Sequence, residues 1–222
     1  MMRPLRWSWL GRVAYRDARQ RQEALRDRIL AGADAEELLL LEHDPVITLG
    51  RSARREHVLA TDAELAAAGI DLVDTSRGGD VTAHGPGQLI IYPVVRIQGV
   101  VRFVEAVGRA IVDELAARDV PAAWRRDPAG VWVGNAKIAA CGLHVKRRVA
   151  IHGFALNVTG EPLALFSRII PCGLTTQVTT IAAHVAAAPA IEALATSLAP
   201  RICAALDRQP VRSFSCHHHP DR

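Results

Sequence analysis

The sequence is poor in aromatic residues and in cysteine, and both shortages limit what the chain can be. Phe, Trp and Tyr together make up 5% of its 222 residues. The four cysteines are far apart and form no CxxC pair, so neither a zinc cage nor a disulfide framework is expected. In a reducing cytosol all of them should be free thiols, of which one or two at most need a function. They are Cys141, Cys172, Cys203 and Cys216.

Long apolar runs are missing as well. None reaches the roughly 18 residues that a membrane-spanning helix needs, and the first ten residues contain no signal-peptide core. We therefore expect a soluble, cytoplasmic protein that does not bind membranes. Hydrophobic residues make up 50% of the chain and charged residues 23%. This fits one globular catalytic domain over residues 1–222, with a frayed tail over about 210–222.

The net charge is +4. Nearly all of the basic residues are arginines, because lysine occurs only at Lys137 and Lys146. Many of the arginines fall between Arg12 and Arg28, where acidic residues are interleaved with them. This pattern indicates a solvated helix face, and we expect no nucleic-acid binding. A basic face would also suit an acidic protein partner, by steering its approach rather than by adding affinity.

Apolar periodicity predicts separate helices and strands, which favours an α+β fold, or an α/β fold with a mixed sheet. Thr61 and Glu64 have the spacing of a capping box and should begin a short helix. Pro200 should break or kink the last helix near Ala199. The other predicted helices cover residues 14–31, 101–118 and 191–206, and the predicted strands cover 38–42, 46–51, 72–75, 88–95 and parts of 130–158.

The segment from Arg77 to Gln88 is the first with the composition of a binding site. It holds four glycines and a proline, and glycine lets the backbone approach a ligand closely. A plain turn can contain Gly-Gly and Gly-Pro-Gly, but it would rarely also carry Asp80, Thr82 and His84. The segment is neither a phosphate-binding Walker loop nor a dinucleotide fingerprint, since it lacks both spacings.

Lys137 and Cys172 are the candidate reactive residues, and each also has an ordinary explanation. Lys137 follows the Gly134-Asn135 turn, where a lysine is usually an exposed charge at the end of a strand. In an apolar pocket its pKa would fall and it could act as a base. Cys172 lies between a proline and a glycine. That setting suits an exposed thiol at a bend, although a buried structural cysteine is the usual finding.

Histidines supply alternative bases. His84, His144 and His152 could each form a Cys–His pair with Cys172, and the sequence does not say which of them lies near it. The segment Cys216–His219 could bind a metal ion opportunistically, or it could simply be a frayed end.

Five motifs in this order resemble the octanoyl-acyl-carrier-protein:protein N-octanoyltransferases of lipoate biosynthesis. Each motif is weak alone, but the ordered set is specific. The resemblance extends over about residues 38–182. The motifs are Leu41–Arg51, Arg77–Gln88, Lys137–Ala139, His152–Val158 and Pro171–Gly173.

The resemblance implies a fold like that of biotin and lipoate protein ligases, a mixed sheet flanked by helices, related to class II aminoacyl-tRNA synthetases. It implies that Cys172 is the nucleophile that carries the acyl group as a thioester, and that Lys137 tunes this thiol and shuttles protons. It implies no cofactor and no metal ion. The residues implied to line the acyl and acceptor site are Arg77, Gly78, Gly79, Asp80, Val81, Thr82, Ala83, His84, Ala140, Cys141, Gly142, Gly153, Phe154 and Ala155.

The implied partners are also specific. The donor would be octanoyl-acyl carrier protein, and the product an amide on a lysine of a lipoyl domain. The acceptors would be lipoyl domains of 2-oxoacid dehydrogenase complexes and the glycine cleavage H protein. The chain departs from the family pattern at Ala83, where a tyrosine is usual, and at Phe154, where a leucine is usual. These departures put the pocket shape and the chain-length preference in question. Leu89, Ile90, Val131 and Ile138 would either line the acyl tunnel or belong to the ordinary core.

Three other functions remain open from the sequence. A lipoate or biotin ligase of the same fold would activate its acid with ATP and would need no cysteine. A non-catalytic module would only bind acyl carrier protein, and the presence of both Lys137 and Cys172 argues against it. A Cys–His hydrolase that uses His84 or His152 would release free octanoate without an acceptor.

Overall fold

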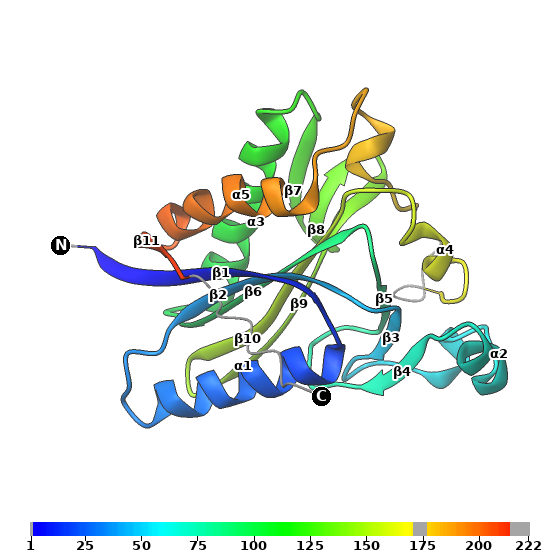
Figure 1. Ribbon diagram of the computed structural model, residues 1–222, viewed down its shortest axis with the longest axis horizontal. Helices are drawn as coiled ribbons and strands as arrows, with labels where there is room; N and C mark the ends of the chain where they lie inside the picture. Colours follow the sequence, from blue (N-terminus) through cyan, green and yellow to red (C-terminus); the bar gives the residue numbers. More distant parts are fainter. Residues whose placement is uncertain (1, 171–176, 214–222) are drawn as a thin grey trace, which may run out of the picture.

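The computed structural model describes residues 2–170 and 177–213. Its strands and helices follow the chain in an order that mixes the two types (Figure 1). The strands are β1 (Arg3–Val13), β2 (Glu37–His43), β3 (Val46–Leu49), β4 (Asp71–Asp74), β5 (Val81–His84), β6 (Gln88–Arg96), β7 (Ala122–Arg126), β8 (Ala129–Val133), β9 (Ala136–Lys146), β10 (Val149–Asn157) and β11 (Arg208–Arg212). The α-helices are α1 (Tyr15–Leu30), α2 (Asp62–Ala67), α3 (Val100–Ala116), α4 (Leu163–Phe166) and α5 (Ile191–Ala205), and the short 3-10 helices include η1 (Arg55–His57) and η3 (Ile181–Ala183).

Eight strands form one mixed sheet, in the order β11-β1-β2-β6-β10-β9-β8-β7. The pairings from β2 to β7 are antiparallel, whereas β1 pairs in parallel with both β2 and β11. The central strands β6 and β10 are buried on both faces, apart from the exposed Arg96 at the end of β6. Such strands require a layer of helices on each side of the sheet.

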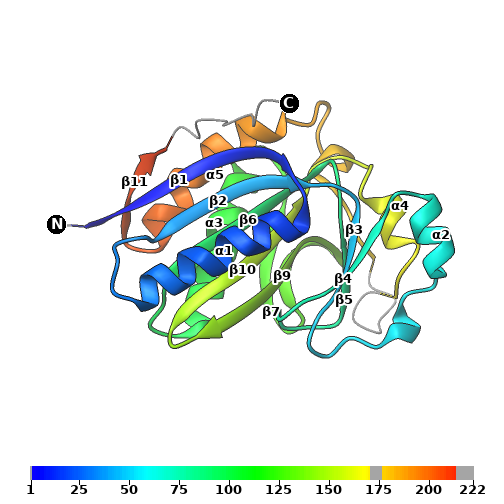
Figure 2. The ribbon, with the colours of Figure 1, turned by 60° about the horizontal axis from the view of Figure 1, so that its bottom comes forward.

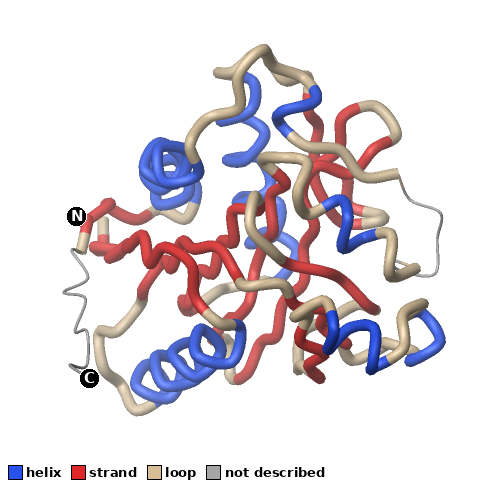
Figure 3. The backbone as a smooth tube through the Cα atoms, turned by 45° about the vertical axis from the view of Figure 1, so that its right-hand side comes forward, coloured by secondary structure: helices blue, strands red, loops and turns tan. Residues whose placement is uncertain are grey.

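Helices supply both layers. The helix α1 covers one face, where Ala18, Leu25 and Ile29 belong to a core cluster with side chains of β2, β6 and β10. The helices α3 and α5 cover the other face, and both belong to the larger core cluster. Figures 2 and 3 show the helices on opposite sides of the strands. The α3 side chains Phe103 and Leu115 are buried at helical spacing, as their period predicts.

A smaller sheet, in the order β4-β3-β5, stands beside the large one with α2 and α4 nearby (Figure 1). Its apolar side chains form a separate core with Leu65 of α2 and Ile169. The predicted capping box is present at the start of α2. The Thr61 side chain accepts from the Glu64 backbone N–H, and the Glu64 carboxylate accepts from the Thr61 backbone N–H. The small sheet brings β5, which lies within the glycine-rich segment, toward β9 and β10.

Several elements differ from the sequence-based expectation. The strands β1, β7 and β11 were not predicted, and β5 interrupts what was expected to be one loop. Residues 208–212 are not frayed, because β11 pairs with β1. The break expected at Pro200 does not occur, since α5 continues through this residue. Pro200 faces solvent, while Leu198 and Ile202 are buried in the core, so packing stabilises the helix across the lost hydrogen bond.

Within the described ranges, no helix has both the length and the apolar character that crossing a bilayer requires.

Candidate active site

A cavity of about 340 Å³ lies where the small sheet meets β9 and β10. Its volume falls in the range of small-molecule sites, roughly 300–1,000 Å³. Lys137 lines it, together with every residue expected at the acyl and acceptor site except Ala83. Three segments that are distant in the sequence therefore meet at one cavity. The other lining residues are Tyr15, Tyr92, Asp127, Pro128, Ala129, His152, Asn157, Phe166 and Val178.

Strand pairing explains how two of these segments come together. In the antiparallel pair of β9 and β10, Gly153 lies opposite Gly142, Phe154 opposite Cys141, and Ala155 opposite Ala140. The glycine-rich segment meets β9 through Gly78, whose N–H donates to the Leu143 carbonyl at 2.8 Å. A side chain at Gly142 would approach the Gly78 carbonyl oxygen to 3.2 Å. Glycine at this point lets the loop lie directly against β9.

Arg77 holds the same loop against the small sheet. Its guanidinium donates to the Thr48 hydroxyl at 3.0 Å, to the Thr48 carbonyl at 2.6 Å and to the Gly78 carbonyl at 3.2 Å. The side chain is buried. A buried guanidinium that donates to several acceptors fixes the backbone around it, since breaking these bonds would leave a buried charge without partners. Arg77 therefore shapes the wall of the cavity as well as lining it.

Ala83 points away from the cavity because β5 alternates its side chains between two faces. Thr82 and His84 line the cavity, whereas Ala83 is fully buried in the core of the small sheet with Ile47. Phe154 belongs to a different core cluster, where its ring lies 6.2 Å from that of Trp124. The two departures from the family pattern therefore do not lie in one packing cluster.

The residues considered as tunnel walls are part of the ordinary core. Leu89, Ile90, Val131 and Ile138 are fully buried in the core clusters and do not line the cavity. Its apolar wall comes instead from Phe154, Ala155 and other side chains that face the space between the sheets.

Lys137 lies at the start of β9, where its half-buried side chain lines the cavity. Its Nζ atom is 4.9 Å from the ring centroid of Trp132, a cation–π distance. The carbon stem passes over Gly130, where an added Cβ would come within 3.2 Å of Lys137 Cε. Trp132 and Gly130 thus hold the ammonium group at the cavity wall.

The backbone of Lys137 also fixes the chain that follows the predicted nucleophile. The Lys137 N–H donates to the Gln177 carbonyl at 2.8 Å, and the Thr179 N–H donates to the Lys137 carbonyl at 3.0 Å. On the other side, the Ile170 N–H donates to the His57 carbonyl at 2.8 Å. Cys172 itself lies outside the described residues, as does the segment Cys216–His219. The chain is therefore anchored on both sides of Cys172, and its return after residue 176 runs beside Lys137.

The model of the lipoyl protein ligase A/B catalytic domain matches residues 14–202. The chain belongs to this family. An octanoyltransferase from Solibacter usitatus is 48% identical over 178 residues, which cover 78% of this chain and 80% of that protein.

Solved structures share the fold of this lipoyl ligase family member at low sequence identity. A bipartite lipoate protein ligase from Thermoplasma acidophilum has a TM-score of 0.71 at 16% identity, covering 97% of this chain and 89% of that one. A biotin protein ligase from Aquifex aeolicus has a TM-score of 0.55 at 14% identity, covering 91% and 70%. The expected fold, a mixed sheet flanked by helices as in the biotin and lipoate ligases, is confirmed.

Three histidines and two tyrosines form a buried cluster at the cavity of this family member. The Tyr92 hydroxyl lies 2.9 Å from His43 Nε2, while His43 Nδ1 lies 2.7 Å from the Val13 carbonyl. His43 must therefore donate from Nδ1 and accept at Nε2. His84 Nδ1 is 2.7 Å from Gln88 Oε1, and the ring of Tyr15 stacks on that of His84 at 6.3 Å. Tyr15 was not expected from the sequence, where nothing marks it as more than a helix start.

Burial keeps these histidines neutral. It lowers the pKa of His84 and of His152 to about 3 and that of His43 to about 4. An imidazole with so low a pKa is a weak base at pH 7. His144, the third base considered from the sequence, lies on β9 and does not line the cavity. His84 and His152 thus line the cavity as neutral imidazoles.

The histidine cluster should make the fold acid-sensitive. The folded-state pKa values lie below the ordinary 6.5, so the unfolded chain binds more protons as the pH falls below 6.5, and stability declines. The slope should reach roughly 1.4 kcal/mol per pH unit for each histidine. Urea unfolding at pH 7, 6 and 5 measures it, and His43→Gln should lower proton uptake on unfolding by about one. An identical slope in wild type and variant would contradict the assignment.

The two cysteines that the structure describes are unlike an activated nucleophile. Burial raises the pKa of the Cys141 thiol to about 12, although Cys141 lines the cavity near Lys137. Burial also raises the pKa of the Cys203 thiol, to about 11, in the core under α5. Both should remain protonated thiols at neutral pH.

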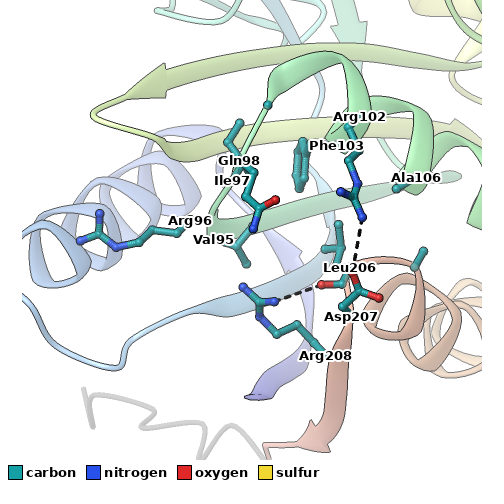
Figure 4. A pocket seen from close by; sticks show the side chains of 12 residues that line it. Val95, Arg96, Ile97, Gln98, Arg102, Phe103, Ala106, Leu206, Asp207 and Arg208 are labelled. Atoms are coloured by element: carbon teal, nitrogen blue, oxygen red, sulfur yellow. Dashed lines mark hydrogen bonds and ion pairs between the residues drawn. The ribbon is translucent and has the colours of Figure 1, made fainter. Parts of the chain in front are cut away.

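A second cavity, of about 290 Å³, lies between the end of β6, the start of α3 and the start of β11 (Figure 4). None of the residues expected at the site lines it. Its arginines are already engaged. Arg102 lies 3.8 Å from the Asp207 carboxylate, Arg208 donates to the Leu206 carbonyl and to Glu36, and Arg96 donates to the Ile29 carbonyl. The residues expected at the site thus line the first cavity and not the second.

Proposed function

We propose that this chain is an octanoyltransferase that carries the acyl group on Cys172 and passes it to a lysine of a lipoyl domain. The observation that carries the proposal is the cavity, which gathers Lys137 and the glycine-rich segment. Backbone hydrogen bonds anchor the chain at Ile170 and at Gln177, on either side of Cys172 in the sequence. Relatives in the family that are named octanoyltransferases support it.

The first step is exchange of the acyl group between two thioesters. A free thiol with a pKa near 8.5 is only a few per cent thiolate at pH 7. The Lys137 ammonium group can stabilise the Cys172 thiolate, or its neutral amine can accept the thiol proton. The thiolate attacks the donor carbonyl carbon, the donor C–S bond breaks, and the donor thiol leaves. Both thioesters are of similar stability, so this step requires no ATP.

The second step forms an amide. The ammonium group of the acceptor lysine first gives one proton to the Lys137 amine, and the neutral ε-amine then attacks the Cys172 thioester. The C–S bond breaks, and a second proton from the attacking nitrogen restores the enzyme thiol. An amide is more stable than a thioester, so this step proceeds downhill. Backbone N–H groups of the glycine-rich segment are suited to stabilise the oxyanion that forms in each step.

Acyl-chain preference follows from burial. The octanoyl tail has about seven carbons beyond its carbonyl, which at roughly 0.8 kcal/mol each give about 5–6 kcal/mol on full burial. This is enough to favour octanoyl over much shorter chains, while one methylene changes the preference by only a small factor. We propose octanoyl-acyl carrier protein as the donor. The proposed acceptors are lipoyl domains of 2-oxoacid dehydrogenase complexes and the glycine cleavage H protein, and the cytoplasm is the location that these partners imply.

The proposal is tested with purified protein, octanoyl-acyl carrier protein and an unmodified lipoyl domain. Mass spectrometry should show one octanoyl group on the lipoyl domain without ATP. A parallel reaction with free octanoate and ATP distinguishes a ligase, which would act only there. Release of octanoate without acceptor modification would indicate a hydrolase. Carrier-protein binding with no transfer in either reaction would indicate a binding module, and any of these three results would overturn the proposal.

A further inference from the structure

Asp80 has one carboxylate oxygen engaged and the other without a partner. Its Oδ2 atom lies 2.5 Å from His57 Nδ1, and the two side chains are only 12% and 18% exposed. Its Oδ1 atom is buried and has no hydrogen-bond partner within the described ranges. Buried carboxylate oxygens are normally hydrogen-bonded, because an unpaired one loses its hydration without compensation. Asp80 lines the cavity, so a small turn of the carboxylate about its Cβ–Cγ bond would present Oδ1 to a ligand that supplies the missing donor.

The backbone of Asp80 is held rigidly in place. The Gly50 N–H donates to the Asp80 carbonyl at 3.2 Å, and the Ser52 N–H donates to the Gly79 carbonyl at 3.1 Å. A side chain at Gly50 would meet the Gly79 carbonyl oxygen at 2.2 Å and the Asp80 carbonyl oxygen at 2.9 Å. Gly50 thus allows the two segments to pack in direct contact, and the carboxylate is positioned before any ligand arrives.

His57 is fixed at the chain that leads to the predicted nucleophile. The Ile170 N–H donates to the His57 carbonyl, the Leu59 N–H donates to the Arg168 carbonyl at 2.8 Å, and Val58 forms a bridge with Ile169. Cys172 follows Ile170 by two residues in the sequence. The Asp80–His57 pair therefore belongs to the part of the fold that holds the start of the cysteine segment.

The ligand that suits Asp80 Oδ1 is a cation with N–H donors. Across the part of the chain that the structure describes, Asp80 forms an ion pair with His57 and with no arginine or lysine. The amino group of an acceptor lysine must enter this cavity to reach the acyl group, and at neutral pH a free lysine is an ammonium ion. A carboxylate that lines the cavity can accept a charge-assisted hydrogen bond from such a group.

We propose that Asp80 binds the ε-ammonium group of the acceptor lysine, and that His57 positions the carboxylate by donating from Nδ1 to Oδ2. This inference rests on the proposed function and assigns the acceptor subsite within it. Asp127 is the other carboxylate that lines the cavity, but it is exposed to solvent. A solvated carboxylate gains less from an incoming ammonium ion than a desolvated one that lacks a partner.

The decisive variant is Asp80→Asn. Its amide oxygen can still accept from His57, while its NH₂ group faces the cavity and repels an ammonium ion. The kcat/KM for the lipoyl domain should fall by about 30-fold, mainly through a higher KM. Acylation of the enzyme by octanoyl-acyl carrier protein should change by less than about twofold, as should discharge of the acyl-enzyme to hydroxylamine, a nucleophile that is uncharged at pH 7. Asp71→Asn, an exposed carboxylate on β4 outside the cavity, is the matched control and should match wild type in all three measurements.

The role of His57 is tested by a pair of variants. His57→Ala should raise the acceptor KM, and His57→Asn, which restores an N–H donor near the position of Nδ1, should bring it back toward the wild-type value. Acylation by the donor should be unchanged in both. A purely structural role would instead lower acylation and transfer together.

Each other outcome overturns the inference. Wild-type kcat/KM for the lipoyl domain in Asp80→Asn would remove Asp80 from the subsite. Equal losses in acylation, hydroxylamine discharge and transfer would mean that the variant only distorts the cavity. Loss of transfer in Asp127→Asn alone would give the subsite to Asp127. If the wild-type protein forms no acyl-enzyme at all, the proposed function itself is wrong, and so is the acceptor subsite that rests on it.

Discussion

Cys172→Ala should form no acyl-enzyme and should lose at least about 10³-fold in kcat for octanoyl transfer, because removing the nucleophile of a covalent mechanism removes both of its steps. Intact-mass spectrometry after incubation with octanoyl-acyl carrier protein should show one octanoyl group on wild type and none on the variant. Double-reciprocal plots for wild type, with donor and acceptor varied in turn, should be parallel, as a ping-pong mechanism requires.

The control for this variant is Cys203→Ala. Cys203 is a buried core thiol on α5, so its loss should lower stability modestly and leave the acyl adduct in place. Peptide mapping must locate the wild-type adduct on the peptide that contains Cys172. An adduct that survives in Cys172→Ala, or one that maps to Cys141 in the cavity, would show that the nucleophile has been assigned to the wrong cysteine.

Local sequence patterns predicted those elements whose residues show an apolar period or a capping-box spacing. The apolar period over residues 101–118 predicted α3, and the Thr61–Glu64 spacing predicted the start of α2. The strands β1, β7 and β11 were missed because arginines lie among their apolar residues. In β1, for example, Arg6 separates the buried Leu5 and Trp7. The order of the strands depends on pairings between distant segments, such as β1 with β11, and no local pattern encodes them.

The sequence predicted which segments form the candidate site, but it did not predict the burial and protonation state of their side chains. The resemblance indicated which stretches should meet, and the cavity contains all of those residues except Ala83. Ala83 differs because the residues around it form a strand, and strand alternation turns its side chain into the core. The neutral state of His84 and His152 comes from tertiary burial. The Asp80–His57 pair joins residues too far apart in the sequence for any local pattern to reveal.

Lys137→Met should lower the rate of acylation by octanoyl-acyl carrier protein by at least about 10²-fold, because the substitution keeps the length of the side chain but removes its charge and its proton-transfer group. Without the ammonium group, the pKa of the Cys172 thiol should rise toward its ordinary value near 8.5. The pH dependence of Cys172 alkylation by iodoacetamide measures this shift, and the inflection should move to higher pH in the variant.

The loss in Lys137→Met can be attributed to the side chain, because the backbone of Lys137 makes the contacts that order this region. The hydrogen bonds to Gln177 and Thr179 use its N–H and carbonyl groups, which methionine retains. Lys146→Met is the matched control, since Lys146 is the only other lysine and lies at the opposite end of β9. It should acylate like wild type. Equal acylation rates in Lys137→Met and Lys146→Met, with the same alkylation profile, would mean that the Lys137 amine does not set the reactivity of the Cys172 thiol. The proposed mechanism, in which Lys137 and Cys172 act together, would then be wrong.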